Sequence, residues 1–84
     1  MISINEENVQ FLNDIRETLA VDSQVEVFLR CGDFFFMLEP HGEEICVRSK
    51  GEILGYYNSF NEMVNKYMIN GKTFIERIAE IEYE

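Results

Sequence analysis

The chain has 84 residues, of which 46% are apolar, and its 16 acidic side chains outnumber the 7 basic ones, which gives a net charge of −9 at pH 7. Seven Phe and four Tyr supply the apolar surface that a disordered acidic tail lacks, so the composition predicts one folded domain over residues 1–84. The negative charge argues against nucleic acid and anionic membranes as direct partners, because phosphate groups are bound mainly by Lys and Arg.

The first predicted element is a helix over residues 4–20. Ser3 and Glu6 have the spacing of a capping box, in which each side chain accepts a hydrogen bond from the other residue's backbone amide. Residues 1–7 have neither the basic start nor the apolar stretch of a signal peptide, and no later apolar run reaches the length of a membrane span, so we expect a cytoplasmic protein. Apolar side chains recur at helical spacing along the helix: Val9, Leu12, Ile15 and Leu19.

Apolar and polar residues alternate from residue 25 to residue 31, which predicts a half-buried β-strand. Gly32-Asp33 then fits a tight hairpin turn of the type that has glycine first. This turn sets the register of the hairpin, and the expected cross-strand pairs are Leu29 with Phe36 and Val27 with Leu38.

A second turn is expected within residues 40–43. We choose its register from the hydrophobic pattern, because a shift by one residue would exchange the apolar face for a polar one. The preferred pairs are Leu38 with Ile45 and Phe36 with Val47. The opposite face of the sheet would then carry a mixture of charged and apolar side chains: Glu26, Phe28, Arg30, Phe35, Met37, Cys46 and Arg48.

A short fourth strand is predicted over residues 52–57, with Leu54 and Tyr56 facing the core. Ser59 and Glu62 form a second capping box, and the apolar spacing after it predicts a helix that Asn70-Gly71 ends.

Thr73 and Glu76 form a third capping box, which predicts a short last helix. Residues 79–84 fit either a helical end or an edge strand. The predicted fold class is α+β, with an N-terminal helix, a three- to four-stranded antiparallel β-meander, and one or two C-terminal helices packed on one sheet face.

The sequence offers little that could support catalysis. His41 is the only histidine and is expected at an exposed hairpin tip. Cys31 and Cys46 would lie on opposite faces of the sheet, so we expect neither a disulfide nor a metal site with His41. There is no glycine-rich phosphate loop and no nucleophile elbow. We therefore expect no cofactor and no enzymatic activity.

Two functional hypotheses follow. The first is a small acidic protein-binding module that occupies a basic surface of a partner, such as a nucleic-acid-binding protein, and acts as an inhibitor or an antitoxin. In size and charge alone the chain is similar to phage anti-defence proteins, immunity proteins and nucleic-acid mimics. The residues expected at the partner interface are Glu26, Phe28, Phe35, Met37, Glu39, Glu43, Glu44 and Glu52.

The second hypothesis is a self-associating accessory domain without catalytic activity, most simply a homodimer. Phe28, Phe35 and Met37 alternate on a face that the helices need not cover, and a second copy could bury them. The N-terminal helix could cover the same face instead.

Overall fold

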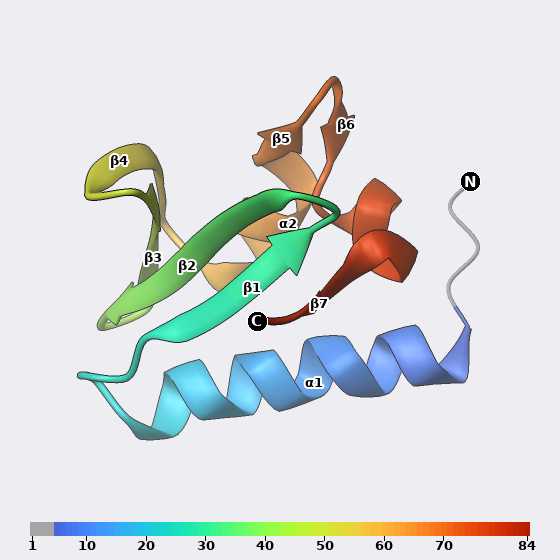
Figure 1. The fold of residues 1–84 in the computed structure, drawn as a ribbon. Coiled ribbons are helices and arrows are strands. Elements are labelled where there is room, and N and C mark those ends of the chain that lie inside the picture. Colours follow the sequence, from blue (N-terminus) through green and yellow to red (C-terminus); the bar gives the residue numbers. More distant parts are fainter. Residues whose placement is uncertain (1–4) are drawn as a thin grey trace.

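The computed structural model describes residues 5–84, and it confirms the predicted α+β class (Figure 1). Helix α1 (Glu6–Val21) is followed by an antiparallel five-stranded sheet and short C-terminal helical pieces. The strands of the sheet are β1 (Val27–Cys31), β2 (Phe34–His41), β3 (Glu44–Ser49), β4 (Glu52–Tyr57) and β7 (Ile81–Tyr83), in the spatial order β4-β3-β2-β1-β7. The remaining elements are α2 (Phe60–Lys66), the two-residue strands β5 (Met68–Ile69) and β6 (Lys72–Thr73), and the 3-10 helix η1 (Ile75–Glu80).

Helix α1 begins two residues later than predicted. Its N-cap is Asn5, whose Oδ1 accepts a hydrogen bond of 2.8 Å from the Asn8 amide. Asparagine is among the best N-cap residues because its side chain satisfies an amide that the helix leaves free. The predicted capping residue Ser3 lies outside the described residues.

The hairpin of β1 and β2 has the predicted register, with Leu29 opposite Phe36 and Val27 opposite Leu38. Gly32 has a φ of +62° at the first turn position. That left-handed conformation is strained for a residue with a Cβ, so the glycine defines where the hairpin turns.

The predicted register between β2 and β3 is wrong by two residues. Leu38 lies opposite Val47, not Ile45, and the turn consists of Gly42-Glu43. A two-residue slip keeps every side chain on its own face, so the hydrophobic pattern could not separate the two registers. The predicted pairing would place His41 first in the turn, whereas the observed one places Gly42 there, with a φ of +68°.

Strand β4 has the predicted bounds, but the prediction that Leu54 and Tyr56 face the core is wrong. The register between β3 and β4 shifts at Val47/Arg48, so that Tyr57 pairs with Ile45 and faces the core, while Tyr56 pairs with Cys46 on the other face. Such a β-bulge inserts one extra residue and reverses the facing of the residues beyond it.

Gly55 leaves room for a neighbouring side chain at this irregularity. A Cβ at position 55 would lie only 2.7 Å from the Tyr57 ring, which crosses over the glycine.

The second helix is shorter than predicted, because Asn70-Gly71 forms a hairpin turn and not a helix end. Helix α2 stops at Lys66, and β5 and β6 pair on either side of the turn. Asn70 and Gly71 have φ angles of +50° and +86°. Two consecutive positive φ angles define the type I′ turn for which Asn-Gly is the preferred dipeptide.

The second capping box is confirmed for Ser59 only, because the Glu62 side chain bonds the Asn58 amide in the preceding loop and not the Ser59 amide. Ser59 Oγ accepts a hydrogen bond from the Glu62 amide, while Glu62 Oε2 accepts one of 2.6 Å from the Asn58 amide. This backbone hydrogen bond, and then the ion pair with Lys66, lower the pKa of the Glu62 carboxyl from its usual value. A carboxyl whose pKa is lowered by folding stabilises the folded state at every pH above the carboxyl's ordinary pKa. This stabilisation is lost as the pH falls through the lowered pKa.

We therefore expect Glu62→Gln to reduce the free energy of unfolding at neutral pH, and the difference from the wild type to shrink in acid. Urea denaturation at neutral pH and below the usual carboxyl pKa measures both values. Glu17→Gln, on the exposed side of α1, is the control for loss of one negative charge. A difference that stays constant into acid would contradict the assigned role of Glu62.

The C-terminal segment contains both structures that the sequence left open. The third capping box is confirmed, since the Thr73 amide donates to Glu76 Oε1 at 2.9 Å and the Glu76 amide donates to Thr73 Oγ1 at 3.3 Å. After η1, residues 81–83 form strand β7, which pairs with β1 as an edge strand. The sheet therefore has five strands, and the prediction of three to four is corrected.

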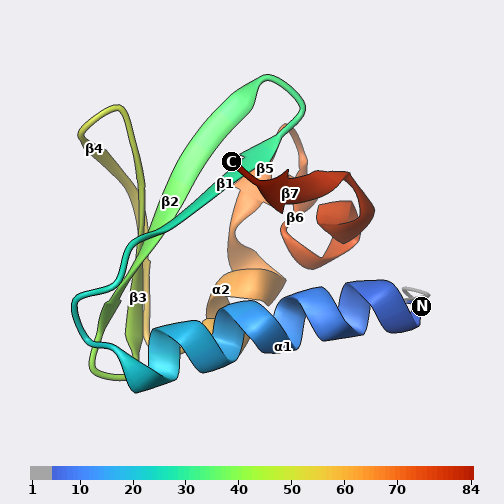
Figure 2. The same cartoon turned by 60° about the horizontal axis from the view of Figure 1, so that its bottom comes forward.

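Helices α1, α2 and η1 share one side of the sheet and enclose the core (Figure 2). Arg16 of α1 lies 5.2 Å from the centre of the Phe60 ring of α2, and Phe11 contacts Tyr83 of β7 edge to face. Helix α1 therefore does not cover the opposite sheet face. The largest fully buried side chains are Phe74, Ile15, Leu29, Leu38, Met63, Val47 and Cys46.

Candidate functional site

The sheet face opposite the helices, here called the outer face, carries large exposed apolar side chains. Phe28 and Met37 are cross-strand partners in its middle, and Phe35 is the next outward-facing residue on β2. Phe28 and Phe35 are 50% and 45% exposed. Ile53 and Tyr56 of β4 extend this surface, because they pair with Arg48 and Cys46 of the same face.

The middle of the outer face is slightly hollowed. Phe28, Phe35 and Met37 line this hollow of about 190 Å³ together with Arg48 and the chain end at Glu84. Pockets that enclose small organic ligands have volumes of about 300 Å³ or more. The shape therefore suits contact with another macromolecular surface better than enclosure of a small molecule.

Two arginines of this middle region are paired with carboxylates. Arg30 Nη2 lies 2.9 Å from Glu82 Oε2, and Arg48 Nε lies 2.9 Å from Glu39 Oε2. The hydrogen bond and the charge of Glu39 raise the pKa of the Arg48 guanidinium. Lys50 and Glu84 also line the hollow and form no ion pair within the described residues.

Most carboxylates elsewhere on the described chain have no ion-pair partner. Four of the sixteen form ion pairs within residues 5–84, namely Glu39, Glu62, Glu80 and Glu82. The other twelve are spread over α1, the turns and the ends of the sheet. The negative potential is therefore largely unopposed, but it surrounds the molecule and is not confined to one face.

The structure brings together the three apolar residues that the sequence predicted at the interface, and it separates the five acidic ones. Glu26 precedes β1, and Glu43 and Glu44 lie at the β2–β3 turn. Glu52 lies beyond the far end of β3, about 17 Å away along the strand. Glu39 is paired with Arg48. These acids can contribute to the two ends of the outer face but do not form one cluster.

Sequence reasoning missed Ile53 and Tyr56 on the outer face. The β-bulge changed the facing of Tyr56, and Gly55 was the one local signal, since glycine inside a strand often marks a bulge. Ile53 faces outward as alternation with Leu54 predicts, but it was not named as an interface residue. Burial, and then the charge of Glu44, raise the pKa of the Tyr56 phenol.

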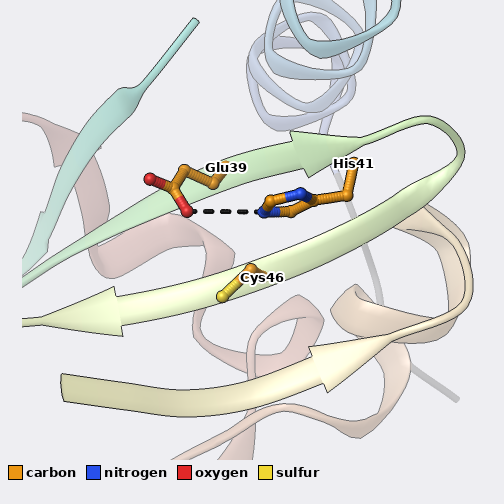
Figure 3. Close-up of side chains that lie close together, drawn as sticks. All are labelled: Glu39, His41 and Cys46. Carbon is orange, nitrogen blue, oxygen red and sulfur yellow. Dashed lines mark ion pairs between the residues drawn. The ribbon is translucent and has the colours of Figure 1, made fainter. Parts of the chain in front are cut away.

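A second feature at one end of the outer face is a cluster of Glu39, His41 and Cys46 (Figure 3). Glu39 and His41 are two residues apart on β2, so both point to the same side, and Cys46 of β3 lies directly opposite Glu39. His41 Nε2 lies 3.5 Å from Glu39 Oε2. One potential ligand atom from each of the three residues lies within 4.8 Å of the other two.

The sequence-based expectation was that His41 forms no metal site, and it weighed His41 only together with Cys31 and Cys46. Cys31 borders the core while Cys46 faces the outer side, so they do lie on opposite faces. The predicted β2–β3 register paired Cys46 with Met37, which would have kept the thiol away from Glu39. The sequence did not supply the β2–β3 register that brings Cys46 next to Glu39. His41 lies at the end of β2 and its side chain is 48% exposed.

The part of the chain that the structure describes contains no helix long and apolar enough to cross a membrane. Comparison with known proteins gives no matching family model, no matching curated protein and no matching solved structure.

Proposed function

We propose that this chain is a non-catalytic protein-binding module that docks through its outer face. The observation that carries the proposal is the pair of half-exposed rings, Phe28 and Phe35, in the middle of a sheet face that no other described element covers. Apolar groups at the centre of a contact and polar groups around it are the usual arrangement of a protein interface.

The charge distribution supports a basic partner. Arg30–Glu82 and Arg48–Glu39 pair two of the central cations, whereas Glu84 at the same hollow forms no ion pair within the described residues, so a cation of the partner would pair with it on docking. Unpaired carboxylates at Glu26, Glu43, Glu44 and Glu52 lie toward the ends of the sheet, where they remain hydrated and attract cations. The complementary surface has an apolar patch with Lys and Arg around it.

A surface of this kind occurs where proteins bind nucleic acid, because phosphate contacts require Lys and Arg. A module that occupied it would act as an inhibitor or antitoxin by exclusion. The cysteines Cys31 and Cys46 are both free, which fits the reducing cytoplasm as the place of action.

Affinity capture from a nuclease-treated lysate tests the proposal. The immobilised wild type is expected to retain a basic protein at low salt and to release it at high salt, because the acidic residues attract it. Phe35→Ser should reduce the recovery at least about tenfold, since central aromatic residues dominate interface energies.

Val21→Ser is the matched control. Val21 is also an exposed apolar side chain, 84% exposed, but it lies at the end of α1 away from the outer face. It should bind like the wild type. Equal recovery with Phe35→Ser, or retention that ignores salt, would contradict docking through the outer face.

Self-association is the second candidate, because a second copy could bury the same two Phe rings. Two copies would bring like-charged ends of the outer face together, so salt should strengthen a homodimer and weaken the proposed complex. Light scattering of the purified chain at low and high salt separates the two. A monomer at both salt concentrations removes the homodimer, and a dimer that tightens with salt favours it over the basic partner.

A further inference from the structure

We propose that Glu39, His41 and Cys46 bind one divalent transition-metal ion of the zinc class at the end of the outer face. Carboxylate, imidazole and thiolate are all zinc ligands, and they reach this point from two adjacent strands (Figure 3). This metal site does not depend on the proposed partner, because the isolated chain carries all three ligands.

The spacing of the ligand atoms fits a tetrahedral site. Bonds of about 2.0–2.2 Å from zinc to nitrogen and oxygen place two such ligands about 3.4 Å apart at the tetrahedral angle. His41 Nε2 and Glu39 Oε2 lie 3.5 Å apart before any adjustment. One ligand atom from each residue lies within 4.8 Å of the other two, so the side chains need to approach by at most about 1 Å to reach the spacing of zinc-bound sulfur, nitrogen and oxygen.

The backbone supports this convergence. Residues two apart on a strand share a face, and directly opposed residues on neighbouring strands have their Cβ atoms about 5 Å apart. Glu39, His41 and Cys46 occupy such positions on β2 and β3. The strand ladder therefore holds the three Cβ atoms in place, and only side-chain rotation is needed to close on an ion.

The burial of Cys46 distinguishes this cluster from an ordinary surface group of charges. Its thiol side chain is 1% exposed, although it faces the open side of the sheet. A buried thiol with an imidazole and a carboxylate beside it favours zinc, cobalt or related ions over magnesium and calcium, which prefer oxygen ligands alone. The ion would replace the thiol proton on binding.

Arg48 supports the ligand geometry from outside the site. Its Nε donates to Glu39 Oε2, the same oxygen that lies 3.5 Å from His41 Nε2. A carboxylate oxygen has more than one lone pair, so Oε2 can keep this hydrogen bond while it binds the ion, and such bonds orient metal ligands in known sites. The fourth position is left to water or to Glu44, the cross-strand partner of His41.

Titration of the tag-free chain with cobalt chloride, followed by zinc chloride, tests the site. We expect one cobalt ion per chain and the near-ultraviolet charge-transfer absorption of a cobalt–thiolate bond, which zinc then abolishes. His41→Ala should weaken cobalt binding at least about tenfold. Because His41 is half-exposed, this variant should keep the wild-type circular dichroism spectrum.

Cys31→Ser is the matched control, since it removes the other thiol from the core side of the sheet. It should retain the thiolate absorption and the wild-type affinity. Cobalt binding without a thiolate band would overturn the proposal. Unchanged binding by His41→Ala, or loss of the band in Cys31→Ser with a wild-type dichroism spectrum, would also overturn it.

Discussion

Phe36→Ala is expected to lower the free energy of unfolding by about 3–5 kcal/mol, whereas Phe35→Ala leaves most of it in place. Phe36 is 3% exposed, and its ring lies 5.4 Å from that of Phe34, 5.8 Å from that of Tyr67 and 6.2 Å from that of Phe74. Removing such a ring from a core costs about 3–5 kcal/mol. That loss is comparable with the whole stability of a small domain, which is about 5–15 kcal/mol.

The two adjacent residues make a matched pair, because they lose the same atoms from opposite faces of one strand. Urea unfolding followed by circular dichroism gives the free energy of unfolding for each. Phe35 is 45% exposed, so its replacement should cost well under half as much as that of Phe36. Similar losses for the two variants would contradict the assignment of inner and outer faces.

Arg77→Met should give the second large loss of stability, of about 2–3 kcal/mol, because hydrogen bonds from charged donors are the stronger ones. The Arg77 guanidinium donates to the Asn70 carbonyl at 2.8 Å and also to the carbonyl of Ile69. It thereby ties η1 to the turn between β5 and β6. Methionine keeps much of the aliphatic length but leaves both carbonyls without this donor.

Denaturant unfolding and amide hydrogen exchange together measure the Arg77 effect. Arg77→Lys should fall between the wild type and Arg77→Met, because the ammonium keeps the charge but lacks the planar fork of donors. We expect faster exchange in residues 68–73 of Arg77→Met than in the wild type. An Arg77→Met variant as stable as the wild type would show that the two hydrogen bonds contribute little.

Local signals predicted those parts of the fold in which one interaction decides the geometry. Gly32 with positive φ determines the β1–β2 register, the Ser59 side chain caps α2, and Thr73 and Glu76 exchange the expected hydrogen bonds at the start of η1. Each of these features involves residues within a few positions of one another. Short-range chemistry therefore sufficed for them.

The errors occurred where several local solutions were nearly equal. The hydrophobic pattern determines which face a side chain takes, but it does not distinguish registers that differ by two residues, as between β2 and β3. Asn70-Gly71 can end a helix or form a type I′ turn. The Arg77 guanidinium donates to the carbonyls of Ile69 and Asn70, and these hydrogen bonds favour the turn. Those contacts come from a later part of the chain.

The candidate site, like the fold, was predicted in part. Phe28, Phe35 and Met37 were placed correctly on one face, because strand alternation determines facing. Tyr56 and the convergence of His41 with Cys46 were missed, since a bulge and a register slip decide them. The distribution of the acids could not be predicted, because surface charges follow no periodic rule that ties them to a face.

Chemical-shift mapping of the isotope-labelled chain with its captured partner shows whether the outer face is a protein-binding surface. We expect the resonances of Phe28, Phe35 and Met37 to change on binding, while those of Glu17 and Val21 on α1 do not. Changes confined to α1, with the outer face unaffected, would contradict binding through the outer face.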